Sequence, residues 1–392
     1  MIKIIAGFAL MLILLVPAMS LHASAQTNPS YMITGAGSTF VYPLMDNWRV
    51  EYNKIHQNIN LNYQSIGSGA GIKLLEQKSV DFAASDAPLS STEEQKAPGV
   101  LTLPESIGGI TITYNIPGMD KGLKLTGPII AQIFMGNITS WNDPAIKNLN
   151  PGANLPNQKI IVAHRSDGSG TTYAFTDYLS KVSPDWKGKI GQAKSVPWPV
   201  GTGGQGNAGV ATIVKSTPYA IGYIELAYAF QNKMAYAFVQ NADGNSFVEP
   251  TLDSVAADAA ASTSLPQADG DWSQVSIVNQ PGNNSYPIST LTYIMIYKNM
   301  NTISGETPDK SNEVLDFLSW VIHDGQQYSS SLLYVPIPDS IKKIDEAGLA
   351  KAAFNGGTVP EFGPLVDLIL AIAVVSVIIV STKTGLGFNP KI

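Results

Sequence analysis

The chain has 392 residues and a formal net charge of −6 at pH 7, and 44% of its residues are hydrophobic. A polypeptide of this length exceeds what one compact core usually holds, so we expect two lobes. The negative charge and the lack of a basic run argue against nucleic-acid binding. The absence of cysteine excludes disulfides and thiolate metal sites. The four histidines are scattered outside metal-ligand spacing, so no metal is expected.

The first 25 residues are typical of a signal peptide. Lys3 precedes an almost entirely apolar run over 4–19, and residues 23–25 are Ala-Ser-Ala, a small-residue cleavage pattern. We expect cleavage after residue 25, so that the mature chain begins at Gln26. A retained N-terminal anchor is the alternative.

After a short polar leader, short apolar stretches alternate with helical periodicity, which is typical of an α/β protein. Ile33 leads into a Gly/Ser-rich turn over 35–39. A helix follows, and Trp48 and Tyr52 lie on its apolar side.

Two further strands are expected after this helix. One covers 59–63 and ends in a second Gly/Ser-rich turn over 65–71, which a short helix follows. The other covers 80–84 and places Asp86 at its carboxyl end. A later strand over 160–163 runs into a third turn at 165–171 and then into an amphipathic helix.

The same local arrangement therefore recurs three times, as a strand, a turn rich in Gly and Ser, and a helix. Free N–H groups and the positive dipole end at a helix start favour an anion. Any one such turn is equally explained by helix capping. Three of them, with one Arg and one Asp at strand ends where α/β sheets bind ligands, indicate an oxyanion site.

The third turn is the most specific of the three. Arg165 offers a planar five-donor fork suited to a tetrahedral oxyanion, and Asp167 is placed to hold that guanidinium. Ser169, Gly170 and Thr171 would present hydroxyl and N–H groups from the start of the helix. The alternative is a surface Arg–Asp pair beside a capped helix.

Asp86 would repel an anion unless the anion carries a proton. An ionised carboxylate only accepts hydrogen bonds, and phosphate has a proton to donate whereas sulfate has none. Such a site would select phosphate over sulfate through an unpaired acceptor. The alternative for Asp86 is a turn residue before Pro88.

A second apolar run lies near the end of the chain, over 364–381, and is interrupted only by Asp367. Its ~27 Å as a helix is just enough to cross a hydrocarbon core. Two lysines follow it, which favours a cytoplasmic tail. We expect a transmembrane anchor behind a linker at 355–363, with a buried helix as the alternative.

The motifs resemble those of phosphate-binding proteins of bacterial and archaeal high-affinity phosphate ABC importers. The segments that carry the resemblance are Thr-Gly-Ala-Gly-Ser-Thr-Phe at 34–40, Ser-Ile-Gly-Ser-Gly-Ala-Gly at 65–71, Val-Asp-Phe-Ala-Ala-Ser-Asp-Ala-Pro-Leu at 80–89, 109–118, Trp-Asn-Asp at 141–143, Arg-Ser-Asp-Gly-Ser-Gly-Thr at 165–171 and Ile-Gly-Tyr-Ile-Glu at 221–225. They stand in family order and span most of the region between the signal peptide and the linker.

The resemblance implies an α/β, two-lobed periplasmic-binding-protein type II fold that closes on phosphate around a hinge. It implies a discontinuous first lobe over 31–105 and 286–354, and a second lobe over 106–285. The phosphate-binding roles that it carries over fall on Thr39, the backbone N–H of Phe40, Ser68, Asp86, Arg165, Ser169, Gly170 and Thr171, with Asp167 supporting Arg165. The expected partners are inorganic phosphate and an ABC permease, the expected state is a monomer, and no cofactor is expected.

Two small departures from the family pattern leave these donors intact. Ser38 stands where relatives often have Ala, and 69–71 is Gly-Ala-Gly where many have Ser-Gly-Gly. The expected C-terminal anchor is a larger departure, which would keep the binding lobes at the outer face of the membrane.

Three other functions remain as alternatives. Residues 201–206 match a Gly-x-Gly-x-x-Gly dinucleotide pattern, but no clear strand precedes them. A secreted phosphate-ester hydrolase would use Ser169 with His164 as base, although the Gly of a nucleophile elbow is missing. A surface oxyanion sensor or adhesin on the same fold is the third, and we expect binding without turnover.

Overall fold

The computed structural model describes residues 30–260 and 265–354. The predicted signal peptide, linker and transmembrane anchor all lie outside these residues. Within the described ranges, no helix combines the length and the apolar character needed to cross a membrane.

The described chain alternates strands and helices, which confirms the predicted α/β class. The strands are β1 Tyr31–Gly37, β2 Ile59–Ser65, β3 Phe82–Ser85, β4 Val100–Tyr114, β5 Lys124–Leu125, β6 Ile161–Arg165, β7 Thr202–Gly204, β8 Ala220–Glu225, β9 Ala235–Tyr236, β10 Phe238–Gln240, β11 Phe247–Val248 and β12 Ser289–Tyr297. The helices are α1 Tyr42–Ile55, α2 Ser68–Glu76, α3 Ser91–Lys96, α4 Gly127–Phe134, α5 Pro144–Leu149, α6 Gly170–Val182, α7 Pro184–Lys189, α8 Gly206–Ser216, α9 Leu226–Gln231, α10 Leu252–Ala260, α11 Pro308–Ile322 and α12 Asp339–Leu349, with short 3₁₀ turns η1 Met300–Thr302, η2 Asp324–Tyr328 and η3 Ser330–Leu332.

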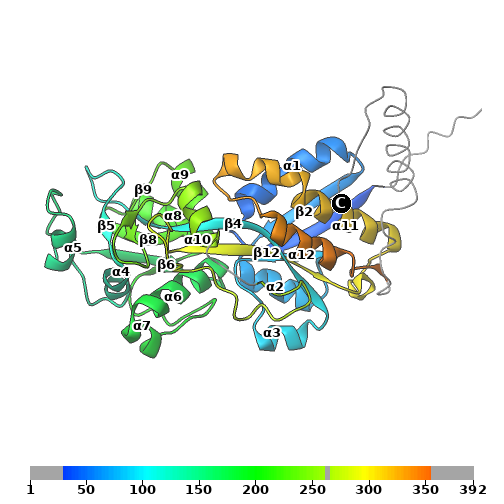
Figure 1. The fold of residues 1–392 in the computed structure, drawn as a ribbon, viewed down its shortest axis with the longest axis horizontal. Helices are drawn as coiled ribbons and strands as arrows, with labels where there is room; N and C mark the ends of the chain where they lie inside the picture. Colours follow the sequence, from blue (N-terminus) through cyan, green and yellow to red (C-terminus); the bar gives the residue numbers. More distant parts are fainter. Residues whose placement is uncertain (1–29, 261–264, 355–392) are drawn as a thin grey trace, which may run out of the picture.

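One sheet runs through both ends of the elongated molecule (Figure 1). Its strand order in the described chain is β2-β1-β3-β12-β4-β8-β6-β7, with β9 also paired to β4. The elements from β5 to α10 gather at one end, whereas α1, α2, α3, α11 and α12 gather at the other (Figure 1). The two ends are called the second half and the first half below.

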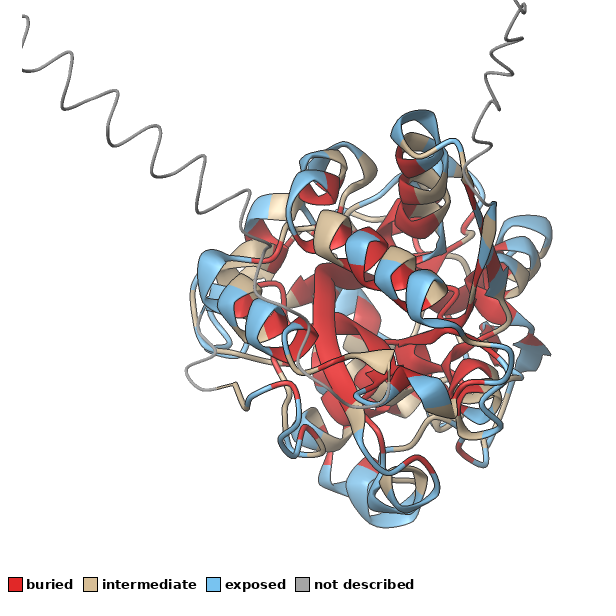
Figure 2. Ribbon diagram, turned by 90° about the vertical axis from the view of Figure 1, so that its right-hand side faces the viewer, coloured by how far each residue is buried: buried red, intermediate tan, exposed pale blue. Residues whose placement is uncertain are grey.

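Strand β4 joins the two halves because it changes partner along its length. Residues 100–109 pair antiparallel with β12, and residues 110–114 pair antiparallel with β8. The chain therefore leaves the first half on β4 and returns to it on β12. Both strands are buried throughout, apart from the half-buried Val100, as are the strands seen inside the helical layers in Figure 2.

The predicted local elements are confirmed with small shifts at their ends. The strand expected over 59–63 is β2, the one over 160–163 is β6, and the first helix is α1 with Trp48 and Tyr52 buried. The strand expected over 80–84 begins only at Phe82, because Val80 and Asp81 form a bend, and the Asp81 carboxylate accepts hydrogen bonds from Thr34.

That carboxylate belongs to a buried ion cluster between β1 and α11. Asp81 accepts hydrogen bonds from the N–H of Thr34 at 2.6 Å and from its hydroxyl at 3.0 Å. Lys310 Nζ lies 2.5 Å from Asp81 and 3.0 Å from Glu306. The side chains of Asp81 and Glu306 are at most 1% exposed, so Lys310 is the cation that compensates two buried carboxylates.

Replacing Lys310 by Met should therefore lower the free energy of unfolding by about 3 kcal/mol, because it leaves two buried carboxylates without a cation. Lys54→Met is the matched control, since the Lys54–Glu51 pair is exposed at its lysine and should contribute about 0.5 kcal/mol. Urea unfolding at neutral pH measures both values. Equal effects of the two substitutions would show that the cluster has no special role.

Candidate functional site

The three Gly/Ser-rich turns meet where the two halves face each other. Strands β1, β2 and β3 end here from the first half, and β6 ends here from the second. Helices α2 and α6 begin at the same place, at Ser68 and Gly170. The predicted site residues that are buried are Thr39, Phe40, Ser68, Asp86, Arg165, Ser169, Gly170 and Thr171, and Asp167 is half-buried.

Arg165 is held in the second half by Asp167. Its Nε donates to Asp167 Oδ1 at 2.7 Å, its Nη2 donates to Asp167 Oδ2, and its Nη1 donates to Thr171 Oγ1 at 3.2 Å. Burial acts to raise the pKa of Asp167, but the hydrogen bonds and charge of Arg165 outweigh it and hold the pKa below its ordinary value. The guanidinium thus presents its Nη1 edge toward the turn of α6.

Asp86 lies opposite, at the end of β3, and is 2% exposed. Its Oδ1 accepts from the hydroxyl of Ser38, and at 3.4 Å from that of Thr292. Its Oδ2 accepts from Thr171 at 3.2 Å. Burial raises the pKa of Asp86 to about 6, against the lowering effects of the Ser38 hydrogen bond and the charge of Arg165.

The halves touch through backbone as well as side chains. Ser68 Oγ accepts from the N–H of Gly170 at 3.1 Å and from the N–H of Asp86 at 3.3 Å. The N–H of Gly69 donates to the carbonyl of Gly168 at 2.9 Å. A Cβ at Gly170 would lie 2.6 Å from the nitrogen of Asp86, so only glycine permits this approach.

Asn207 completes the site and was missed by the sequence analysis. Its Nδ2 donates to Thr39 Oγ1 at 3.0 Å and to Thr171 Oγ1 at 3.2 Å, so it joins hydroxyls from both halves. Its Oδ1 accepts from the N–H of Glu225 at 3.0 Å. It stands one residue inside α8, at the end of the 201–206 glycine pattern.

No clear strand was expected before that glycine pattern, and residues 197–200 are indeed irregular; the short strand β7 lies within the pattern itself. Thr202–Gly204 forms β7 beside β6, and α8 begins at Gly206. The signal that would have found Asn207 is the same strand, glycine-rich turn and helix that marked the other three segments.

Two predicted donors make local bonds in this structure. The hydroxyl of Ser169 caps α6 by accepting from the N–H of Thr172 at 3.0 Å, and it keeps its own proton to donate. The N–H of Phe40 donates to Ser38 Oγ at 3.0 Å. His164 stacks on Trp198, and no hydrogen bond joins it to Ser169 within the described residues.

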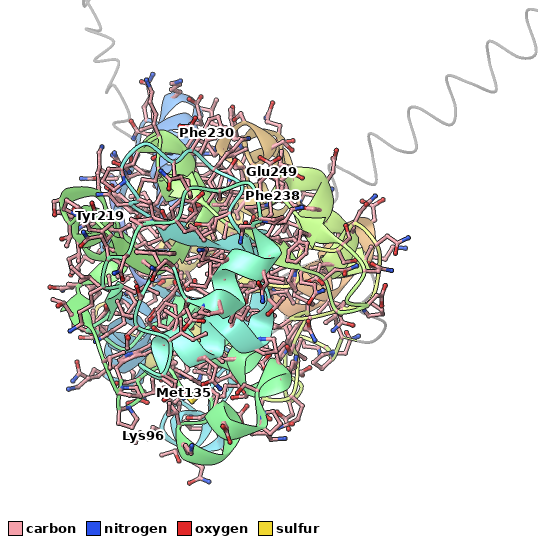
Figure 3. All side chains as sticks on the ribbon, turned by 90° about the vertical axis from the view of Figure 1, so that its left-hand side faces the viewer. Lys96, Met135, Tyr219, Phe230, Phe238 and Glu249 are labelled. Carbon is pink, nitrogen blue, oxygen red and sulfur yellow. The ribbon has the colours of Figure 1, made fainter. Side chains whose placement is uncertain are left out.

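A hollow of about 540 Å³ opens at the edge of the site, lined in part by Thr39, Tyr42, Gly206 and Tyr228. A larger hollow, of about 780 Å³, lies elsewhere on the second half and contains none of the predicted site residues. Phe230 lines it and stands exposed on α9 (Figure 3).

The fold and this arrangement define a two-lobed binding protein. Residues 22–324 match the family model of the PBP superfamily domain. The chain is 44% identical over 332 residues to the phosphate-binding protein PstS of Xylella fastidiosa (strain Temecula1), which covers 83% of this chain and 86% of that protein. It is 37% identical over 369 residues to the PstS of Methanocaldococcus jannaschii, covering 88% and 94%. The chain belongs to the PstS family of phosphate-binding proteins.

The solved structures agree on the fold. A high affinity periplasmic phosphate-binding protein, solved with phosphate bound, superposes with a TM-score of 0.65 over 83% of this chain and 96% of its own. At 19% sequence identity this likeness concerns the fold alone. The predicted two-lobed periplasmic-binding-protein fold is thereby confirmed.

The raised pKa of Asp86, about 6, makes a prediction for stability. The folded chain holds this proton more tightly than the unfolded chain, whose aspartates titrate near ~3.9, so the ionised group destabilises the fold fully above about pH 6 and not below about pH 4. Asp86→Asn should raise the free energy of unfolding on the order of 2 kcal/mol at neutral pH, and the gain should vanish in acid.

Urea unfolding at both pH values measures this gain. Asp167→Asn is the control of opposite sign, since the pKa of Asp167 is lowered and its loss should destabilise at neutral pH. A gain for Asp86→Asn that did not depend on pH would contradict the assignment of the effect to ionisation.

Proposed function

We propose that the chain binds inorganic phosphate between its two halves, outside the cytoplasm, and delivers it to an ABC permease. The family of the chain is named for ligand binding, and we infer a binding protein without turnover. The observation that supports the ligand is the buried ring of donors around one carboxylate. Thr171 donates to the Asp86 carboxylate and accepts from Arg165, and Ser68 beside them accepts from the N–H groups of Asp86 and Gly170.

A bound phosphate would take over the bonds that these donors make to one another. Arg165 Nη1 supplies a charge-assisted bond, and the hydroxyls of Thr39, Ser68 and Thr171 supply further donors. The starts of α2 and α6 add the positive ends of two helix dipoles. Ser169 and the N–H of Phe40 would turn from their local bonds to the anion.

Asp86 supplies the selectivity in this proposal. As an ionised acceptor it takes the proton of a mono- or dibasic phosphate, whereas sulfate would place a bare oxygen against it. Asp167 acts indirectly, through Arg165, because it fixes the guanidinium and neutralises part of its charge.

Binding would close the halves around the strands that cross between them. We propose lobe boundaries near 105 on β4 and near 286 before β12, so that the first lobe is 31–105 with 286–354 and the second is 106–285. In this structure, where the halves are in contact, Lys194 donates to Glu93 on α3 at 2.6 Å and to the carbonyl of Pro88 at 3.3 Å. Opening the cleft would break both contacts together with the Gly69–Gly168 bond.

Calorimetric titration of the full chain with phosphate, sulfate and a nucleotide tests this function. Tight one-to-one binding of phosphate alone, with no product released, is the expected result. Arg165→Ala should weaken phosphate binding by about a hundredfold or more, because it removes the buried cation of the site. Arg49→Ala, which removes an exposed arginine paired with Asp46, is the control and should leave the affinity unchanged.

In the same titrations Asp86→Asn should lower the ratio of the sulfate to the phosphate dissociation constant by about a hundredfold or more, since the amide donates to an oxygen that the carboxylate repels. Unaltered rejection of sulfate would rule out selection by the proton of the ligand. If phosphate gives no binding heat after any co-purified ligand has been removed, the proposed function is ruled out.

The anchor is the second part of the proposal. We propose that 364–381 spans the membrane once and holds the binding lobes at its outer face. The full chain should then sediment with membranes and resist extraction by alkaline carbonate, whereas a chain ending at residue 361 should be released. Release of the full-length chain into the medium would contradict the anchor while leaving phosphate binding untouched.

A further inference from the structure

A second buried carboxyl group lies behind Asp86, and one hydroxyl connects the two. Thr292 on β12 places its Oγ1 3.4 Å from Asp86 Oδ1 and 3.1 Å from Glu105 Oε1. A threonine hydroxyl has one proton, and an ionised carboxylate only accepts. Both contacts are hydrogen bonds only if one of the two carboxyl groups is protonated and donates to Thr292.

The surroundings of Glu105 favour the protonated form. Its side chain is on β4 beside the crossing between the halves, the residue is 0% exposed, and Oε2 has no hydrogen-bond partner among the described residues. No ion pair reaches Glu105 within residues 30–260 and 265–354. The titratable groups that act on it or feel its charge come from three other elements and are all acidic, namely Asp86 after β3, Asp345 on α12 and Tyr63 on β2.

Asp345 adds a second unpaired acid to this region. It is 0% exposed, and in the part of the chain that the structure describes neither of its carboxyl oxygens has a hydrogen-bond partner. Burial, and to a smaller extent the charge of Asp86, raises the pKa of Glu105 to about 8 against the effect of the Thr292 hydrogen bond. The pKa of Asp86 is about 6, so near neutral pH the shared proton resides on Glu105.

We propose that a proton on Glu105 is part of the phosphate site, because it makes Glu105 donate to Thr292 and so turns the Thr292 hydroxyl toward Asp86. The donated bond stabilises Asp86 as the ionised acceptor that a protonated phosphate needs. When Glu105 loses its proton, the Thr292 hydroxyl donates to Glu105 instead. The lone pairs of the Thr292 oxygen then face Asp86. Glu105 is thus a positioning residue, and this inference rests on the proposed binding of phosphate.

The sign of the pH dependence follows from this relay. Affinity for phosphate should be full while Glu105 is protonated and should fall as the pH rises through its pKa of about 8. Phosphate and Asp86 titrate as well, but they do so in wild type and in a Glu105 variant alike. The ratio of the two dissociation constants therefore isolates the contribution of Glu105.

The test compares the full chain with its Glu105→Gln variant, by calorimetric titration with inorganic phosphate from about pH 6.5 to about pH 9.5. The glutamine amide donates as the protonated acid does, so the variant should bind within about threefold of wild type at neutral pH. Above about pH 8 the wild type should lose about tenfold in affinity per pH unit relative to the variant, because one proton is linked to binding.

Two further variants sharpen the result. Asp258→Asn on α10 removes another buried acid whose pKa burial raises to about 8, and it should follow the wild type at every pH. Thr292→Val removes the hydroxyl that connects Glu105 with Asp86. It should therefore weaken phosphate binding at neutral pH and abolish the fall in affinity at alkaline pH. In the Thr292→Val background, Glu105→Gln should then have no further effect.

The inference is overturned, while phosphate binding stands, if the ratio of the wild-type to the Glu105→Gln dissociation constant stays constant over the whole pH range. Loss of all binding in a folded Glu105→Gln variant overturns it too, as does an additive effect in the double variant. If Glu105→Gln does not fold, a Thr292→Val chain that retains the full alkaline fall is the overturning result. A wild type that does not bind phosphate removes the proposed function and this inference together.

Discussion

The site depends on keeping one ionised carboxylate, that of Asp86, out of water. A buried charge of this kind is costly unless hydrogen bonds compensate it. The donors come from both halves, Ser38 and Thr292 from the first and Thr171 from the second. The carboxylate is therefore fully satisfied only when the halves lie together, so in the proposed function closure and selectivity depend on the same group.

Glycine makes this closeness possible. The halves approach along backbone, with Gly69 bonded to Gly168 and the nitrogen of Gly170 bonded to Ser68. A side chain at Gly170 would collide with the backbone nitrogen of Asp86. The Gly/Ser-rich turns thus serve two needs, because they expose N–H groups at helix starts and let two backbones meet.

Local features of the site were predictable because local interactions produce them. Arg165 and Asp167 are two residues apart at a strand end, and their pairing needs no other part of the chain. The turns at Ser68 and Gly170 follow strands and begin helices, a pattern that periodicity and composition reveal. Asn207 has the same kind of signal, and it was missed because its turn also matches a dinucleotide pattern.

The sequence by itself determined the strands, the turns, the helix starts and the residue types that favour an oxyanion, since spacing and composition set these. Only the tertiary structure decided that Thr292 and Glu105 stand behind Asp86. Thr292 is 206 positions from Asp86 along the chain and Glu105 is 19 (105 − 86), and they meet it because β12 returns antiparallel between β3 and β4. Strand pairing between distant segments depends on which apolar faces are buried together, and no local pattern in one strand specifies its partner.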